Sequence, residues 1–240
     1  MPGRADSTRS DTALGATPFR PRQLALALDH PESYAREDFL SGSCNEDALA
    51  LLDSWPDWPA NAVAVIGPAG SGKTHLATMW AAVAGARVVS THALDQAALP
   101  AALATGALVV ENAAAVPDGR TLFHLINLAR EENSFLLLTA HAPPAAWPFA
   151  IPDLLSRLRA LPVVALKAPD DAMLRAVIVK LAADRQLAVD ANVVRYLSAR
   201  IERSFAAAKA AVTALDREAL RQRRPATRAL AAEVLRGRGS

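Results

Sequence analysis

The sequence predicts an α/β fold, in which a parallel β-sheet is covered by helices, followed by an all-helical segment. Three observations predict it. Short, almost continuously apolar runs alternate with helical periodicity in the middle of the chain, a glycine-rich turn joins the first run to a helix, and the β pattern disappears after Lys167. Strands that alternate with helices indicate a parallel sheet, and fully apolar runs are typical of strands covered on both faces.

The expected elements follow one another at regular spacing. A helix over 45–54 ends at the segment SWPDWPAN, because proline cannot continue a helix. The expected strands are 62–66, 87–90, 107–111, 135–139 and 163–166. Helices are expected at 74–84 and 120–132, in a short stretch before the fifth strand, and then at 170–185, 190–201, 204–222 and 226–236.

Composition divides the chain and limits its class. Residues 1–20 are polar and without periodicity, so we expect a disordered tail; 21–30 contain a short apolar island, 31–168 the α/β domain and 169–240 a helical lid. The formal net charge is only +2, which does not demand a nucleic-acid partner. A single cysteine, Cys44, excludes an internal disulfide, and neither a membrane span nor a signal peptide is evident. We therefore expect a cytoplasmic protein.

The glycine-rich turn fits a phosphate-binding loop. Residues 67–74, GPAGSGKT, match the pattern G-x-x-x-x-G-K-[ST] between a strand and a helix. Glycines allow the backbone amides to approach phosphates at the helix N-terminus, Lys73 reaches the β- and γ-phosphates, and the Thr74 hydroxyl binds Mg²⁺. The alternative is a chance strand-to-helix turn. The expected ligand is ADP or ATP, bound by Gly67, Pro68, Ala69, Gly70, Ser71, Gly72, Lys73, Thr74 and His75.

An acidic residue follows the third expected strand. Glu111 stands where a magnesium-side carboxylate is needed, and otherwise it is a solvated strand end. Asn112 stands where many ATPases carry a second acid that activates water. Because an amide does not accept a proton from water at neutral pH, we expect weak or no intrinsic hydrolysis.

Two further polar positions complete the predicted machinery. Thr139 is the first choice, and His141 the second, for a contact with the γ-phosphate at the end of the fourth strand, although either could simply cap the strand. Arg157 could reach a nucleotide held by a neighbouring subunit as an arginine finger, with Arg159 as its competitor. An ordinary surface arginine is the alternative.

Together these features resemble the AAA+ module of the DnaA family of bacterial replication initiators, and more closely the Hda family of short DnaA homologues that inactivate the initiator. The resemblance covers residues 22–236. It is carried by QLALAL at 23–28, by the segment 34–45, by the Glu111-Asn112 pair, and by the segments 138–144 and 154–158.

The resemblance implies roles for two N-terminal segments. QLALAL is similar to the peptide by which Hda binds the DNA polymerase sliding clamp, with contacts from Gln23, Leu24, Leu26 and Leu28. An edge strand or a packed segment would look the same. Segment 34–45 is similar to the one that wraps the adenine, which implies contacts from Phe39, Leu40 and Asn45.

The lid departs from the family pattern. The family places a sensor 2 arginine at the start of its third lid helix, and the matching position here is Ala206, with Arg203 and Lys209 nearby but out of register. The resemblance implies that the loss of this cation weakens γ-phosphate sensing, so we expect that ADP can be the resident ligand.

The resemblance implies a regulator that binds the sliding clamp and stimulates hydrolysis of DnaA-bound ATP, with Arg157 acting in trans. The sequence ends soon after the lid, where DnaA continues into a DNA-reading domain, so direct DNA binding is not expected. Assembly into homo-oligomers stays open. The rivals are a stand-alone ATPase of the helicase-loader type, which Asn112 disfavours, and a small-molecule kinase, which the position of the lid disfavours.

Overall fold

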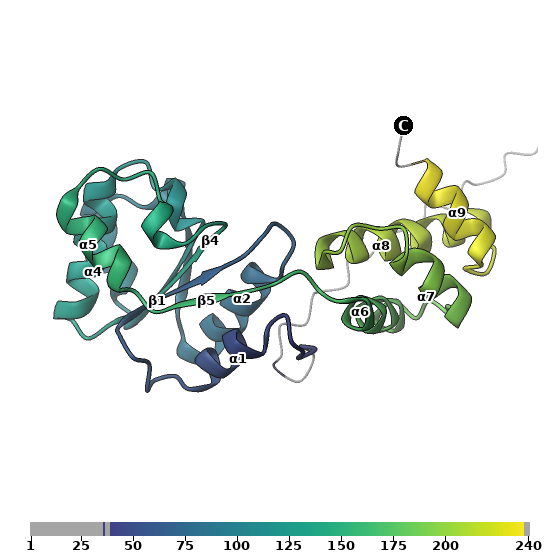
Figure 1. Ribbon diagram of the computed structural model, residues 1–240, viewed down its shortest axis with the longest axis horizontal. Helices are drawn as coiled ribbons and strands as arrows, with labels where there is room; N and C mark the ends of the chain where they lie inside the picture. The colour runs from purple at the N-terminus through teal and green to yellow at the C-terminus, as the bar shows by residue number, and fades with distance from the viewer. Residues whose placement is uncertain (1–35, 37–38, 238–240) are drawn as a thin grey trace, which may run out of the picture.

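The structure, a computed structural model, describes Arg36 and residues 39–237, and it has two parts joined by the segment after the last strand (Figure 1). The first part contains the strands β1 (Ala62–Ile66), β2 (Arg87–Ser90), β3 (Ala107–Glu111), β4 (Phe135–Ala140) and β5 (Val163–Ala165). Its α-helices are α1 (Glu46–Asp53), α2 (Lys73–Ala84), α3 (Leu99–Leu103), α4 (Gly119–Glu131) and α5 (Pro152–Ala160). The lid contains α6 (Asp171–Asp184), α7 (Ala191–Ser198), α8 (Phe205–Gln222) and α9 (Arg228–Arg236).

The five strands form one parallel sheet in the order β2-β3-β4-β1-β5. β1 therefore lies between β4 and β5, and its Val65 pairs with Thr139 of β4. Ligands of open α/β sheets bind beyond the carboxyl ends of the strands. This order brings the turn after β1 next to the end of β4, with the end of β3 one strand further on.

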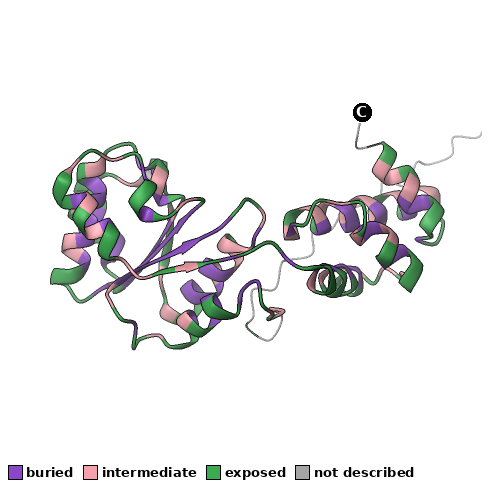
Figure 2. Cartoon of the chain, viewed as in Figure 1, coloured by how far each residue is buried: buried purple, intermediate pink, exposed green. Residues whose placement is uncertain are grey.

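Helices cover the sheet on both faces, and each face has its own core. One core joins α1 and α2 to the sheet and includes Leu76, Trp80 and Val65; the other joins α3, α4 and α5 and includes Leu125 and Leu154. Figure 2 shows the buried residues concentrated on the strands and on the inner faces of these helices. Burial at about 25 cal/mol per Å² of apolar surface drives this packing.

The sheet corrects one expectation from the sequence. We expected all five strands to be covered on both faces, and this holds for β1, β3 and β4, whose residues are buried apart from the half-buried Phe135 and Glu111. It is wrong for β2 and β5, where most residues are exposed. These two strands form the edges of the sheet, so each has only one neighbouring strand.

The lid has a separate core of small and aliphatic side chains from its four helices, among them Leu174, Leu197 and Leu215. Each lid helix begins at a side chain that caps it. The side chains of Asp170, Asp190, Ser204 and Thr227 accept a hydrogen bond from a backbone N–H three residues later. Such caps contribute about 1 kcal/mol each and fix where a helix starts.

The predicted α/β fold and the C-terminal helices are confirmed. The short helix α3 was not predicted, because LPAAL is too brief to show a helical period. Residues 1–20 and the peptide with Gln23, Leu24, Leu26 and Leu28 lie outside the described residues. Within the described part of the chain, no helix is long and apolar enough to cross a membrane.

Candidate nucleotide-binding site

The turn between β1 and α2 has the geometry of an anion-binding loop. Gly70 and Gly72 have φ angles of 70° and 96°, a region that side chains rarely adopt, and Gly72 caps α2. A Cβ atom at Gly67 would lie 2.7 Å from the Leu166 carbonyl oxygen, so glycine is also required there by space. The loop thus presents backbone amides at the start of a 12-residue helix.

Lys73 is held inside the curve of this loop. Its Nζ donates hydrogen bonds of 2.8 Å to the carbonyl oxygens of Gly67 and Pro68. Burial lowers the pKa of the Lys73 ammonium below its usual value. A partly desolvated cation at this point gains more from an arriving phosphate than an exposed lysine would.

The loop also contains a buried hydroxyl suited to a polar ligand. The Ser71 side chain is 2% exposed, and its Oγ has no hydrogen-bond partner among the described residues. Buried polar groups normally have hydrogen-bond partners. The unpartnered Ser71 hydroxyl is therefore consistent with a loop whose partner is a bound anion. The loop residues therefore fit the phosphates of a nucleotide.

The ends of β3 and β4 are tied together beside the loop. The backbone N–H of Asn112 donates to Thr139 Oγ1 at 3.0 Å, and the Thr139 side chain is 4% exposed. Thr139 accepts this bond and keeps its own proton for donation to another group. The structure thus joins two of the predicted residues, whereas His141, after the end of β4, is exposed.

Asn112 adopts a left-handed backbone conformation, with φ 54° and ψ 47°. Asparagine and aspartate tolerate this conformation better than most residues. The backbone therefore explains why a small polar residue stands here, but either side chain satisfies it. The backbone conformation therefore does not decide between an amide and a carboxylate at residue 112.

The donor set suits a hard cation only together with phosphate oxygens. The exposed Thr74 and the half-buried Glu111 each offer oxygen atoms of the kind that Mg²⁺ prefers. The described residues contain no cluster of three or more His, Cys, Asp or Glu side chains suited to a metal. Thr74 and Glu111 therefore remain predicted Mg²⁺ ligands that need a nucleotide to complete the site.

Residues 39–45 lie against the loop helix and the hinge. The ring of Phe39 meets that of His75, on α2, edge to face at 5.0 Å. Asn45 is buried and folds the segment, because its Nδ2 donates to the Leu40 carbonyl and its Oδ1 accepts from the Gly42 N–H, both at 2.9 Å. Phe39, one of the three residues expected to contact adenine, thus lies against the helix that follows the phosphate loop.

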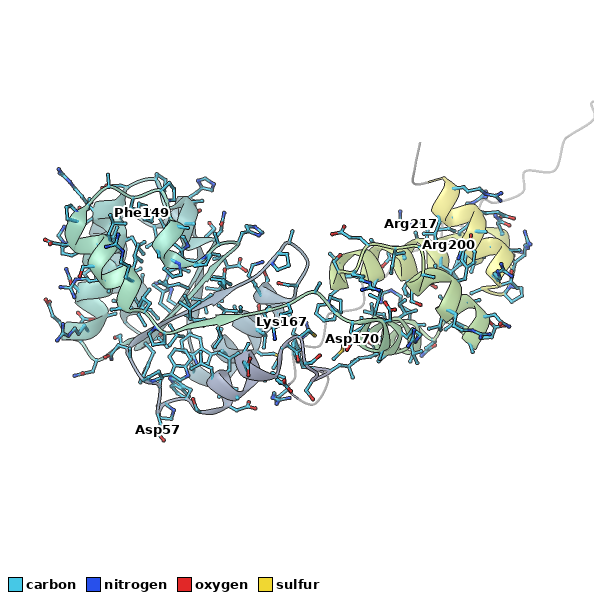
Figure 3. All side chains as sticks on the ribbon, in the orientation of Figure 1. Asp57, Phe149, Lys167, Asp170, Arg200 and Arg217 are labelled. Carbon is cyan, nitrogen blue, oxygen red and sulfur yellow. The ribbon has the colours of Figure 1, made fainter. Side chains whose placement is uncertain are left out.

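The lid touches the same loop. The backbone N–H of Phe205, the first residue of α8, donates to the Gly70 carbonyl oxygen at 2.9 Å. A Cβ atom at Gly70 would lie 2.9 Å from the Cβ of Ala206. Figure 3 shows Lys167 and Asp170 in the segment that connects the two parts. The site therefore lies between the sheet and the lid, with α8 over the loop.

Ala206, the residue that the resemblance assigns to the sensor 2 position, is the second residue of α8. Arg203, one of the two nearby cations, forms an ion pair of 2.8 Å with Asp171. This pair directs the guanidinium toward the start of α6. Lys209 lies further along α8 and has an exposed side chain.

Arg157 occupies a different face of the molecule. Its guanidinium lies over the ring of Phe123, 5.3 Å from the centroid, while Arg159 is exposed. α4 and α5, which carry this pair, lie at the end of the α/β domain away from the lid (Figure 1). Arg157 is therefore held apart from the lid side, where the loop of its own chain is found.

Sequence reasoning missed Phe123 and Phe205. Phe123 appears in the sequence as one more apolar residue of an amphipathic helix, and only the pairing of α4 with α5 shows what it contacts. Phe205 contributes a backbone N–H, which no residue type signals. Neither had a signal that pattern analysis could have found.

No protein-family model matches this chain, and no curated protein matches it in sequence. Its fold is similar to domain III of the replication initiation protein DnaA from Thermotoga maritima, with a TM-score of 0.70 and 17% identity, over 85% of this chain and 96% of that one. Similarity to the Holliday junction branch migration motor RuvB of Thermotoga maritima gives a TM-score of 0.69 and 16% identity, over 85% and 72%. For a DnaA bound to AMPPCP and single-stranded DNA, the TM-score is 0.63 and the sequence identity 17%. The match covers 79% of this chain and 68% of that one. The chain thus has a DnaA-like AAA+ fold.

Proposed function

We propose that this chain is an AAA+ regulator of the Hda type. It binds ADP or ATP, attaches to the DNA polymerase sliding clamp, and stimulates hydrolysis of ATP held by the initiator DnaA. Its own ATPase activity is weak, and the reaction that it accelerates takes place in the partner's site. Replication initiation is limited as a result.

The observation that carries this proposal is the position of Arg157. The side chain lies on α5, remote from the lid, and stacks on Phe123. An arginine in this place is suited to a nucleotide bound by another subunit, where it stabilises charge that develops on the transferred phosphoryl group. A stacked guanidinium keeps its planar donors available and loses less conformational freedom when it binds.

The nucleotide of the chain itself has a separate role in the proposal. The loop amides and Lys73 hold the phosphates, Thr74 and Glu111 would hold Mg²⁺, and Phe39, Leu40 and Asn45 border the adenine. Bound nucleotide supplies negative charge between the loop and α8. Asn112 cannot act as a general base toward water, so this site is suited to retaining a nucleotide.

Clamp attachment rests on the sequence of residues 23–28. An extended QLALAL segment would place Leu26 and Leu28 in an apolar pocket and Gln23 at its polar edge. Tethering then raises the local concentration of the regulator around DNA-bound clamps. The double variant Gln23→Ala/Leu26→Ala should lose clamp binding and keep nucleotide binding.

The arginine finger is tested with DnaA loaded with radiolabelled ATP, in the presence of clamp on DNA. Arg157→Ala should reduce the stimulated hydrolysis rate by about 10³-fold, the lower end for an arginine finger. Clamp binding and the melting temperature should not change. Arg159→Ala, on the same helix, serves as the matched control. Full stimulation by Arg157→Ala would overturn the assignment.

The likeness to RuvB favours a second candidate, a stand-alone ATPase of the helicase-loader type. RuvB is described as a motor, and its fold matches this chain as well as that of DnaA does. A loader-type ATPase should turn over ATP without DnaA and should not need residues 23–28. Steady turnover by the purified protein alone, abolished by Lys73→Ala, would favour this candidate.

A further inference from the structure

Charge is distributed unevenly between the two parts of the chain. Residues 169–240 contain 14 Lys and Arg against 8 Asp and Glu, whereas residues 1–168 contain 12 against 16. The small net charge of the whole chain therefore conceals a basic lid and an acidic remainder. A basic domain attracts polyanions even when the complete protein is nearly neutral.

Part of this excess gathers around one tyrosine. A hollow of about 250 Å³ in the lid is lined by Asn192, Arg195, Tyr196, Arg200 and Arg228, and we call it the Tyr196 hollow. The guanidinium of Arg200 lies 4.0 Å from the centroid of the Tyr196 ring and that of Arg228 lies 5.4 Å from it. The turn after α7 and the first residue of α9 thus place two cations against one half-buried ring.

The cations of the Tyr196 hollow lack acidic partners. Arg195 donates to Asn192 Oδ1 at 2.7 Å, and among the described residues none of the three arginines forms an ion pair. Two other arginines of the lid do form ion pairs. Arg203 pairs with Asp171, and Arg221 pairs with Glu218. Like charges that share one hollow repel each other, so the arrangement is stabilised by an anion that binds there.

The hollow is separate from the candidate nucleotide site. The nucleotide loop meets the lid at the start of α8, while α7 and α9 lie at the end of the lid away from the α/β domain (Figure 1). All three arginines are exposed. A ligand in the hollow can therefore extend across the outer surface of the lid.

We propose that the Tyr196 hollow binds the phosphate backbone of a nucleic acid. The planar guanidinium group matches phosphate oxygens with two parallel hydrogen bonds, and stacking on Tyr196 fixes its plane while its N–H donors stay available. A nucleic acid supplies phosphates at a spacing that can engage several of these arginines at once. This contact goes beyond the clamp and initiator interactions, and it differs from our expectation from the sequence that the chain does not touch DNA directly.

The test measures fluorescence anisotropy of a labelled 30-base-pair duplex, and of its single strand, with the full chain at salt concentrations from 50 to 200 mM. Arg200→Ala/Arg228→Ala should weaken binding at least about tenfold at 50 mM salt and reduce the slope of log K against log salt by about 2. Tyr196→Leu should weaken binding several-fold, whereas Tyr196→Phe, which keeps the ring, should not. Circular dichroism melting checks that the variants fold.

A charge-matched control removes two other exposed lid arginines. Arg175→Ala/Arg217→Ala, on α6 and α8, lowers the charge equally but leaves the Tyr196 hollow intact (Figure 3 labels Arg200 and Arg217). Equal loss in both double variants would show that the general field of the lid binds DNA, and would overturn the proposal. So would the absence of wild-type binding at 50 mM salt, or displacement of the duplex by polyglutamate as effectively as by unlabelled DNA.

Discussion

The phosphate-loop side of the candidate nucleotide site and the side formed by the end of β3 and the start of α8 differ in which ATPase residues they carry. On the loop side every position of the phosphate-binding pattern is present, from Gly67 to Thr74, and the structure folds it around Lys73. On the opposite side we predict that Asn112 occupies the position of a catalytic acid and Ala206 that of a sensor arginine. The comparison teaches that holding a nucleotide and hydrolysing it rest on separate residues, so a chain can keep one ability and lose the other.

The two sides also depend on different kinds of chemistry. Phosphate binding uses backbone amides and the conformations that glycine allows. A single side-chain substitution therefore abolishes phosphate binding at only a few positions of the loop. Hydrolysis requires a proton acceptor and a cation at exact positions on side chains. Substitutions at Lys73, Asn112 and Ala206 test this contrast.

The largest effect is expected from Lys73→Ala. Loss of the hydrogen bonds from a charged group to phosphate, each worth about 1.5–3 kcal/mol, should weaken ATP and ADP binding about 100-fold. Equilibrium binding of a fluorescent ATP analogue measures this change. Lys167→Ala, an exposed lysine of the hinge, is the control. Unchanged affinity in Lys73→Ala would mean that the loop does not bind the phosphates.

Lys73 should also make binding sensitive to alkaline pH. Burial lowers its pKa, so the ammonium loses its proton at a lower pH than an ordinary lysine does. The charged form binds phosphate, and affinity should therefore fall as the pH rises through this depressed pKa. Lys73→Arg keeps its charge, so its affinity, although lower at pH 7, should not show this decline. Parallel declines in both proteins would assign the effect to another group.

Asn112→Asp should increase the intrinsic ATPase rate, by about tenfold. The substitution introduces a carboxylate beside Glu111, while a complete general base contributes 10²–10⁴-fold. Aspartate tolerates the left-handed conformation of residue 112, so the bond from its N–H to Thr139 Oγ1 should persist. Single-turnover hydrolysis of labelled ATP gives the rate. Asn112→Ser, without a carboxylate, should remain as slow as the wild type, and an equal gain in both would reject the explanation.

Ala206→Arg should shift nucleotide preference toward ATP, by about fivefold relative to ADP. An arginine at the start of α8 would reach the γ-phosphate across the contact between Phe205 and Gly70. A fully formed hydrogen bond to a charged group contributes about 1.5–3 kcal/mol, and a fivefold shift corresponds to a part of that energy. Competition between ATP and ADP for the site measures the shift. Ala206→Gln tests whether charge is required. A shift of equal size in Ala206→Gln would point to packing.

Most of the fold was predictable because its strands and longer helices have strong periodic signals. The central strands are apolar throughout, and α4 and α8 have clear apolar faces that end at capping residues. The burial of the edge strands was predicted wrongly, because the sequence of β2, RVVS, does not indicate how many strands lie beside it. α3 is shorter than two helical turns and gave no period.

The candidate site was predictable where a pattern determines the residue type, and not where tertiary contact does. The glycines of the loop and the strand-end Glu111 follow from local geometry. The bond between Asn112 and Thr139 joins residues that are 27 positions apart in the sequence. The ring that contacts Arg157 belongs to α4, and no motif connects that helix with α5. The arginines of the Tyr196 hollow come together only through the packing of α7 against α9, so the sequence alone does not group them.

The smallest effect is expected at Phe123, and it tests whether Arg157 is held ready. The cation–π contact at this partly exposed place is worth about 0.5–1 kcal/mol, so Phe123→Leu should reduce stimulation of DnaA-bound ATP hydrolysis about threefold. The loss should appear in the maximal rate and not in the concentration that gives half stimulation, because Phe123 positions the guanidinium after the complex has formed. Phe123→Tyr keeps the aromatic face and should restore the rate. If leucine and tyrosine behave alike while Arg157→Ala remains inactive, the arginine acts in trans without any help from the ring beneath it.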